Sequence, residues 1–222
     1  MSSTSFASRP SRSGTRAGRL VALALVAAVA LSAALAAPAL ARKKPLTDIP
    51  LLWKPTDEIG ELGTVDLTGL SKVTVRVEPF TDSRDNPKLI GKNVEDADKG
   101  RVLEVTTREE VGPWVADRMA WSLQQLGVGT AETGGTVVLK GDILRFLVTE
   151  SHTYESDFGV KVTLETPGGK TLWTGIANGS ATRFGRSYKA ENYYEVLSDA
   201  VLEATHDLLT NSAFREALQK GK

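Results

Sequence analysis

The sequence contains no cysteine, and this absence excludes several classes of function together. Structural disulfides, thiolate metal sites and cysteine nucleophiles all need a thiol, and so does a lipid anchor on an N-terminal cysteine. Histidine is nearly as scarce, because only His152 and His206 occur and neither has a partner at metal-ligand spacing. We expect both histidines to have structural or surface roles.

Recognisable catalytic motifs are missing as well. The chain has no phosphate-binding loop and no dinucleotide fingerprint after a strand, and Gly185–Ser187 lacks the second glycine of a nucleophile elbow. The acidic loops Asp82–Asn86 and Glu95–Asp98 carry oxygen ligands of the type that calcium prefers, but neither has the spacing of a calcium loop. Solvated turns are the simpler interpretation. We therefore expect a protein without enzyme activity, cofactor or metal.

The first of these loops has a local structural explanation. Asp82 can accept hydrogen bonds from nearby backbone N–H groups, and Arg84 can pair with a carboxylate. Together with Gly91, which follows the apolar pair Leu89–Ile90, these residues are predicted to structure the loop. The alternative is that Asp82 and Asp85 act as the carboxylates of an envelope hydrolase, which requires both side chains to meet in one pocket with a perturbed pKa.

One long apolar run is present, and it lies near the N-terminus. Residues 1–19 contain four arginines and no acidic residue. The apolar run follows at Leu20–Ala37, and Ala39–Ala41 then fits the small-x-small pattern of signal peptidase sites. We predict a cleaved signal peptide at residues 1–41. A retained membrane anchor is the alternative, because the run is nearly long enough to span a bilayer. Either way we expect an exported protein, in the periplasm or associated with the outer membrane.

Positive charge is not concentrated anywhere in the remaining chain. Residues 42–222 hold 23 basic and 27 acidic residues, a formal charge of about −4. Without a basic stripe, nucleic acid is not an expected partner. Residues 42–70, which contain several prolines and glycines, are predicted to be a partly ordered lead-in with at most one short strand near Ile49–Trp53. Residues 71–222 are predicted to form a single α+β domain.

The clearest structural signal is a hairpin in the third quarter of the chain. Apolar residues occupy every second position from Phe158 to Leu164, with polar residues between them, so one face of this strand is apolar and the other is wet. Pro167–Gly168 suits a tight turn, after which the chain returns through Trp173 and Ile176. Such a strand needs a cover over its apolar face.

Further strands are predicted before the hairpin. Val73–Val77 alternates with polar residues and ends at Pro79, and Val102–Val105 suggests a brief strand. Val137–Val148 has apolar residues on both phases of the alternation, which is typical of a central strand that is covered on both faces.

Two long helices would supply the cover. Apolar residues at helical spacing predict one helix that begins at Thr107 or Pro113 and ends before Gly127, and a second with Asn192 as its N-cap. A short helix is predicted to restart at Asn211 or Ser212. This order of elements predicts an α+β fold in which two long helices pack on one face of a mainly antiparallel sheet.

Aromatic residues gather around the hairpin and the start of the last long helix. Tyrosine and tryptophan suit surfaces that are half apolar and half wet, so these residues are a candidate partner-binding surface. The alternative is ordinary packing under a loop. The five candidates are Trp173, Phe184, Tyr188, Tyr193 and Tyr194.

Several short fragments, in this order, carry a resemblance to a known family. They are Val75-Arg76-Val77, Asp82-Ser83-Arg84, Leu89-Ile90-Gly91, Leu126-Gly127-Val128, Asp157-Phe158-Gly159-Val160 and Val196-Leu197-Ser198-Asp199-Ala200. With the exported N-terminus, they resemble the YajG-like bacterial envelope lipoproteins over most of residues 48–220. The resemblance implies a Gram-negative envelope protein with a non-enzymatic role. The lipidated cysteine of that family is absent here, so lipid anchoring does not carry over, and no catalytic residue carries over either.

The leading hypothesis is a periplasmic binding or assembly module that recognises an envelope protein or outer-membrane component through a sheet edge or its aromatic surface. One alternative is a carrier that holds a lipid or another apolar ligand between helices and sheet, which requires a sizeable apolar cavity. The other is the carboxylate-dependent hydrolase. The sequence leaves the partner's identity and the oligomeric state open.

Overall fold

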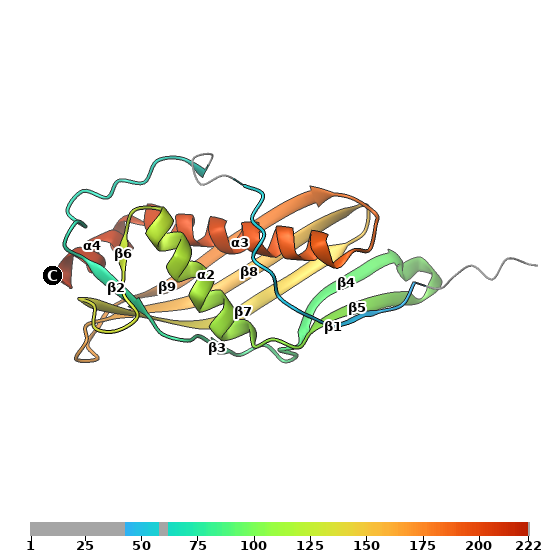
Figure 1. Ribbon diagram of the computed structural model, residues 1–222, viewed down its shortest axis with the longest axis horizontal. Coiled ribbons are helices and arrows are strands. Elements are labelled where there is room, and N and C mark those ends of the chain that lie inside the picture. The colour runs from blue at the N-terminus through green and yellow to red at the C-terminus, as the bar shows by residue number, and fades with distance from the viewer. Residues whose placement is uncertain (1–42, 58–61, 222) are drawn as a thin grey trace, which may run out of the picture. The chain divides into compact units, whose positions relative to one another are not determined.

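A computed structural model of the chain describes residues 43–57 and 62–221 (Figure 1). The predicted signal peptide, and the retained anchor that is its alternative, lie outside the described residues. No helix in the described ranges is long and apolar enough to cross a membrane. The elements are β1 (Leu46–Ile49), β2 (Thr74–Val77), β3 (Thr81–Asp82), β4 (Leu89–Asp96), η2 (Ala97–Lys99), β5 (Arg101–Thr107), α2 (Val111–Gln125), β6 (Gly129–Thr130), β7 (Val137–Glu150), β8 (Thr153–Glu165), β9 (Thr171–Phe184), α3 (Ala190–Thr210) and α4 (Ser212–Lys220).

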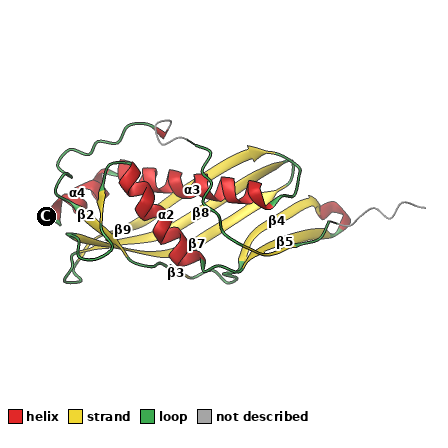
Figure 2. Cartoon of the chain, viewed as in Figure 1, coloured by secondary structure: helices red, strands yellow, loops and turns green. Residues whose placement is uncertain are grey.

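Within the described residues, β7 is the central strand of a nine-stranded sheet. β8 lies antiparallel along one of its edges, and the other edge is shared by β2, β3 and β4, which all run parallel to it. The prediction of a mainly antiparallel sheet is therefore wrong, because the sheet is mixed, while the α+β class is confirmed (Figure 2). Pro79 lies between β2 and β3, and the loop at residues 83–88 lies between β3 and β4. Neither reverses the direction of the chain, so the three strands run the same way along β7. α2 then carries the chain back, as a parallel pairing requires.

A β-bulge in β7 explains a second difference from the prediction. The register with β8 shifts between Ile143 and Arg145, and the buried positions change phase there. Ile143 and Phe146 are both fully buried on the helix side, whereas Leu144 is 37% exposed on the opposite face. A bulge inserts one residue and moves the side chains that follow it to the other phase. The bulge therefore explains the change of phase after Ile143, whereas Val138, which lies before it on the other phase, is also buried.

The predicted hairpin is confirmed as β8 and β9, which pair from Thr153↔Phe184 to Glu165↔Thr171. The alternating apolar positions from Phe158 to Leu164 are fully buried. In the turn, Gly169 rather than Gly168 takes the positive φ, at 82°. The alternation of β8 thus identifies the face of the sheet that the helices cover.

The two long helices cover the same face of the sheet, as predicted (Figure 1). In α2 the apolar stripe from Val111 to Leu123 is buried, and Gly127 follows the helix with a φ of 93°. α3 begins at Ala190, with Lys189 rather than the predicted Asn192 in the N-cap position, and Asn211 supplies the side-chain cap of α4. Helix periodicity therefore predicted the packing faces well and the first residue of α3 less well.

A direct backbone contact sets the distance between α3 and β9. Ala177 and Gly179 of β9 are buried under the helix. A Cβ atom on Gly179 would lie 1.9 Å from the carbonyl oxygen of Ala200, so no side chain larger than hydrogen fits at this position. α3 therefore rests on the backbone of the strand.

Residues before β2 also pack on the domain. β1 pairs in parallel with β5, and it lies earlier than the strand predicted near Ile49–Trp53. The segment Leu51–Asp57, here called the strap, then crosses the helices (Figure 1). The ring of Trp53 contacts those of Trp114 and Trp121 in α2, with centroids 5.9 and 5.5 Å apart.

Replacing Gly179 by alanine should lower the free energy of unfolding by about 1–3 kcal/mol or more, because the new Cβ would push α3 off β9. Urea denaturation measures the change. Gly168→Ala is the matched control, since its Cβ would meet only the Thr166 hydroxyl, at 3.9 Å, and should change stability by less than about 1 kcal/mol. Equal effects of the two substitutions would contradict the direct contact.

Candidate functional site

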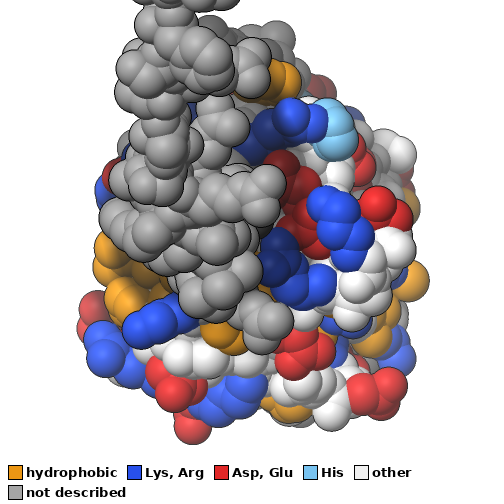
Figure 3. All heavy atoms as spheres, turned by 90° about the vertical axis from the view of Figure 1, so that its right-hand side faces the viewer, with side chains coloured by type: hydrophobic (Ala, Val, Ile, Leu, Met, Phe, Trp, Pro, Cys, Tyr) orange, Lys and Arg blue, Asp and Glu red, His pale blue; other side chains and the backbone are white. Residues whose placement is uncertain are grey.

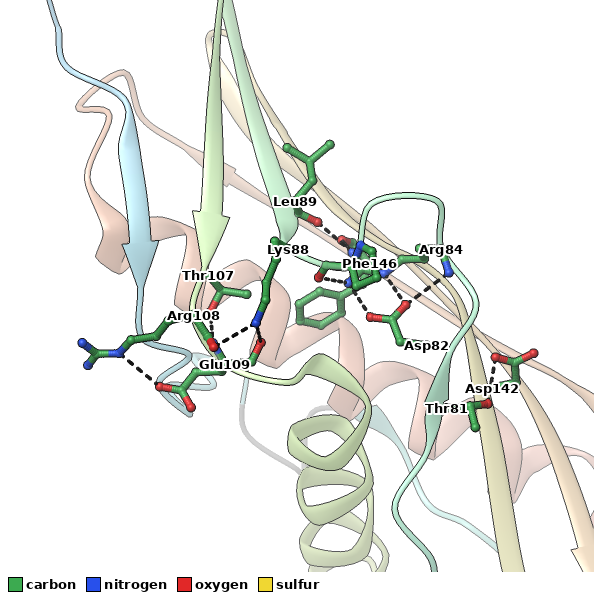
Figure 4. A network of polar contacts seen from close by, with 11 residues as sticks. Thr81, Asp82, Arg84, Lys88, Leu89, Thr107, Arg108, Glu109, Asp142 and Phe146 are labelled. Atoms are coloured by element: carbon green, nitrogen blue, oxygen red, sulfur yellow. Dashed lines mark hydrogen bonds and ion pairs between the residues drawn. The ribbon is translucent and has the colours of Figure 1, made fainter.

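Arg84 closes a gap in the sheet between β3 and β4 (Figure 4). β3 pairs with β7 as far as Ile143, and β4 pairs with it from Val148 onward. Between these points, the guanidinium of Arg84 donates hydrogen bonds to the carbonyl oxygens of Phe146 in β7, at 2.9 Å, and of Leu89 in β4, at 2.7 Å. The side chain therefore takes the place of a pairing strand across the gap.

Asp82 holds this guanidinium in position. Its two carboxylate oxygens accept hydrogen bonds from Nε and Nη2 of Arg84 at 2.8 and 2.7 Å, and the backbone N–H of Arg84 donates to the same carboxylate at 3.3 Å. The side chains of Arg84 and Asp82 are only 9% and 12% exposed. A two-pronged, mostly buried pair of this kind is stronger than a surface ion pair.

A second set of contacts connects the same loop to β1 and to the start of α2. Lys88 Nζ donates hydrogen bonds to the carbonyl oxygens of Arg108 and Glu109 at 3.0 and 3.3 Å. The Thr107 hydroxyl accepts from the N–H of Glu109 at 3.1 Å and donates to the carbonyl of Ile49 at 2.8 Å. These contacts, drawn in part in Figure 4, fix the loop, β1 and α2 relative to one another.

The carboxylates on which a hydrolase would depend line different hollows. Asp82 borders a hollow of about 330 Å³ together with Lys88 and Glu110. Asp85 borders another, of about 320 Å³, together with Leu144 and other residues. Both oxygens of Asp82 are already bound by Arg84. The arrangement therefore does not present the two carboxylates to one substrate.

A buried carboxylate organises the C-terminal end of β7. Glu150, the fully buried last residue of β7, accepts hydrogen bonds from the hydroxyls of Tyr154 and Tyr193, both at 2.7 Å, and from the N–H of Tyr188 at 2.9 Å. The Tyr188 hydroxyl in turn accepts from the N–H of Leu46 in β1 at 3.0 Å. Burial, and then the hydrogen bond to Glu150, raises the pKa of Tyr193, so its hydroxyl remains a donor.

The five aromatic residues predicted to bind a partner do not share one surface. Tyr188, Tyr193 and Tyr194 are buried, and the first two belong to the Glu150 network. Trp173 is half-buried and packs edge-on against Phe214 of α4, with ring centroids 5.1 Å apart. Phe184, at the end of β9, is 84% exposed. The role of these residues in binding stays a prediction, with Phe184 as the accessible member.

Of the three residues predicted to structure the loop, two meet directly. Asp82 and Arg84 form the pair described above. Gly91 lies in β4, opposite Val148 of β7, and a Cβ atom there would be 2.3 Å from Cε1 of Tyr193. Gly91 therefore makes room for the Tyr193 ring.

The candidate site residues predicted from the sequence did not include the acidic residues of α3. Asp199 is 5% exposed and accepts hydrogen bonds from the N–H groups of Thr56 and Asp57 in the strap, at 2.6 and 3.1 Å. It belongs to a row of acids at every fourth position of the helix: Glu191, Glu195, Asp199, Glu203 and Asp207. Acids at this spacing resemble an ordinary solvated helix face. The regular row was the signal that could have drawn attention to them.

β9 forms one free edge of the sheet, since among the residues that the structure describes it pairs only with β8. The N–H of Ala181 donates to the Ser156 hydroxyl of β8 at 2.8 Å, whereas the N–H of Ser180 donates away from β8, to the carboxylate of Glu203 on α3. Because backbone groups alternate along a strand, the N–H of Thr182 lies on the same side as that of Ser180. This edge can pair with an added strand.

The face of the sheet opposite the helices is polar. Arg145 bridges Asp157 of β8 and Asn178 of β9, at 2.9 and 2.7 Å. Two exposed apolar residues of β9 interrupt this polar character, Ile176 at 53% and Phe184 at 84% exposure. Figure 3 shows a different side of the molecule, the one at the right of Figure 1, and there basic and acidic side chains are interspersed among the described residues.

No protein family model and no curated protein matches the sequence. Among solved structures, the chain is similar to a DUF330 protein from Xanthomonas campestris, with 11% identity, a TM-score of 0.44 and coverage of 75% of this chain and 91% of that chain. It is also similar to PelC from Paraburkholderia phytofirmans, solved as a dodecamer (15% identity, TM-score 0.35, 65% and 93% coverage). A third is a Caulobacter crescentus chain assigned as a lipoprotein, with 16% identity, a TM-score of 0.36 and coverage of 46% of this chain and 80% of that chain. These likenesses are too distant to assign a family, and the YajG-like resemblance stays a prediction.

Replacing Arg84 by lysine should lower the free energy of unfolding by about 2–4 kcal/mol, because a single ammonium cannot reach Asp82, Phe146 and Leu89 together. Guanidinium chloride denaturation measures this, and amide hydrogen exchange should speed up in residues 83–88. Arg108→Lys is the control, since that side chain is 65% exposed, and should change stability by less than about 0.5 kcal/mol. A similar small effect at both positions would show that Arg84 does not bridge the gap.

Tyr193→Phe should destabilise the fold by about 1–3 kcal/mol, because one oxygen of the buried Glu150 would lose its donor. Tyr194→Phe removes a hydroxyl from the next ring of the same helix, outside the Glu150 network, and should have a smaller effect. Thermal unfolding of both variants distinguishes the two positions. If Tyr194→Phe were the more damaging, the Glu150 network would not have the structural weight assigned to it.

Proposed function

We propose that this chain is a non-catalytic binding or assembly module of the bacterial cell envelope, and that it binds an extended segment of an envelope protein along β9. The predicted signal peptide at residues 1–41 supports export. The free edge of β9 carries the binding mode. In strand addition, main-chain hydrogen bonds supply affinity, and contacts to alternate side chains supply specificity.

Three features of β9 support strand addition. It is 14 residues long, and it contains neither proline nor lysine, two residues that commonly protect exposed edges. The N–H groups on the Ser180 side of the strand face away from β8. Ile176 and Phe184 stand exposed beside this edge and offer apolar contacts to the side chains of an added strand.

The other two functions considered from the sequence have less support. A carrier would need space between helices and sheet, yet the backbone of α3 touches that of β9 at Gly179. A hydrolase would need Asp82 and Asp85 together, yet they border separate hollows. Binding without chemistry therefore fits the arrangement of these residues better.

Thr182→Pro should abolish partner binding while leaving the fold intact, because proline removes an N–H on the free side of β9 and an edge strand tolerates this loss. The measurement is photocrosslinking in intact cells of the native host, with a benzoylphenylalanine in place of the exposed Phe184. We expect a crosslink to one envelope protein, which Thr182→Pro removes.

Thr182→Ala is the matched control, because it shortens the side chain and keeps the N–H. A crosslinker at the exposed Glu216 of α4 is the positional control. Crosslinks that survive Thr182→Pro in a folded variant, or that arise equally from position 216, would refute binding along β9.

A further inference from the structure

The carboxylate of Glu203 lies beside Ser180 on the free edge of β9. It comes from α3 and accepts the hydrogen bond of the Ser180 N–H, the backbone group that a pairing strand would otherwise bind. The Ser180 hydroxyl lies within reach of the same oxygen, at 3.5 Å. Glu203 therefore occupies, within the chain, a position that an added strand must take over.

In the described part of the chain, Glu203 resembles Asp199, whose donors are uncharged groups of Thr56 and Asp57, and differs from two acids earlier in the row, which form ion pairs. Glu191 pairs with Lys54, and Glu195 pairs with Arg183. The donors to Glu203 in the described part of the chain are the uncharged groups of Ser180. Among the described residues, a negative charge thus lies beside the edge with no cation paired to it.

Strand addition would displace Glu203 from Ser180. The Ser180 N–H would then donate to a carbonyl oxygen of the added strand, as in any β ladder. The carboxylate would lose its donor at the same time that the strand excludes water from it. A buried acceptor without a donor is costly, and a carboxylate more so, unless the added strand brings a cation to it.

We propose that Glu203 restricts the β9 edge to extended segments that carry a lysine or arginine beside Ser180, with its side chain directed toward α3. This inference rests on the proposed function. The incoming cation replaces Ser180 as the partner of Glu203, so every hydrogen bond broken on binding is remade. A second copy of this chain fits less well, because antiparallel pairing of two β9 edges centred on Ser180 would bring two Glu203 carboxylates together.

The test uses residues 42–222, the chain that cleavage of the predicted signal peptide leaves, and two peptides of equal length, one alternating valine with lysine and one alternating valine with glutamate. Fluorescence anisotropy measures their affinities. We expect the lysine peptide to bind at least roughly tenfold more tightly, the effect of about 1.4 kcal/mol. Glu203→Gln should remove most of this preference, because glutamine can still accept from Ser180 but carries no charge.

Glu216→Gln is the matched control, because it removes one negative charge from an exposed position on α4 and should leave the preference unchanged. If Glu216→Gln lowers the preference as much as Glu203→Gln does, general attraction to an acidic protein explains it and the role of Glu203 is refuted. Thr182→Pro separates the two proposals. Binding that Thr182→Pro abolishes but Glu203→Gln leaves equally lysine-selective would overturn this inference alone, whereas binding indifferent to Thr182→Pro, or no binding of either peptide, would overturn both.

Discussion

The backbone of β7 must satisfy its hydrogen bonds on two edges along its 14 residues, and the sheet is arranged around that requirement. On one edge a single long strand, β8, does so. On the other edge β2, β3 and β4 succeed one another, and the guanidinium of Arg84 fills the interval that they leave. The helices then need to cover only one face. The parallel pairings, the bulge and the Arg84–Asp82 pair thus all belong to the way in which the two edges of β7 are hydrogen-bonded.

Local patterns in the sequence predicted those parts of the fold that local physics decides. The alternation from Phe158 to Leu164 located β8 and its buried face, and the apolar stripe of α2 located its packing side. The direction of β2, β3 and β4 along β7 depends on pairings between distant residues, which no local pattern encodes. The bulge near Leu144 was visible as a mixture of phases, but a buried strand produces the same mixture.

The candidate site was predictable only in part, for a similar reason. Asp82 and Arg84 are close in sequence, so their pairing could be anticipated, whereas the carbonyls that Arg84 binds come from β4 and β7. Tyr188 and Tyr193 were predicted to lie on a binding surface because nothing in the sequence reveals Glu150 as their buried acceptor. The importance of Glu203 depends on which edge of the sheet is free, and that follows from topology alone.

Because the side chain of Arg84 bridges β3 and β4, the continuity of the sheet does not depend on the length of the loop that connects these two strands. Arg84 binds β7 and the start of β4 directly, and the loop tip at Asp85 and Asn86 is exposed. Extra residues at this tip would lengthen an external excursion without shifting the register of β4 against β7. The tip is therefore a natural attachment point for an epitope or a fluorescent reporter, and a place where related chains can differ in length while keeping the same sheet.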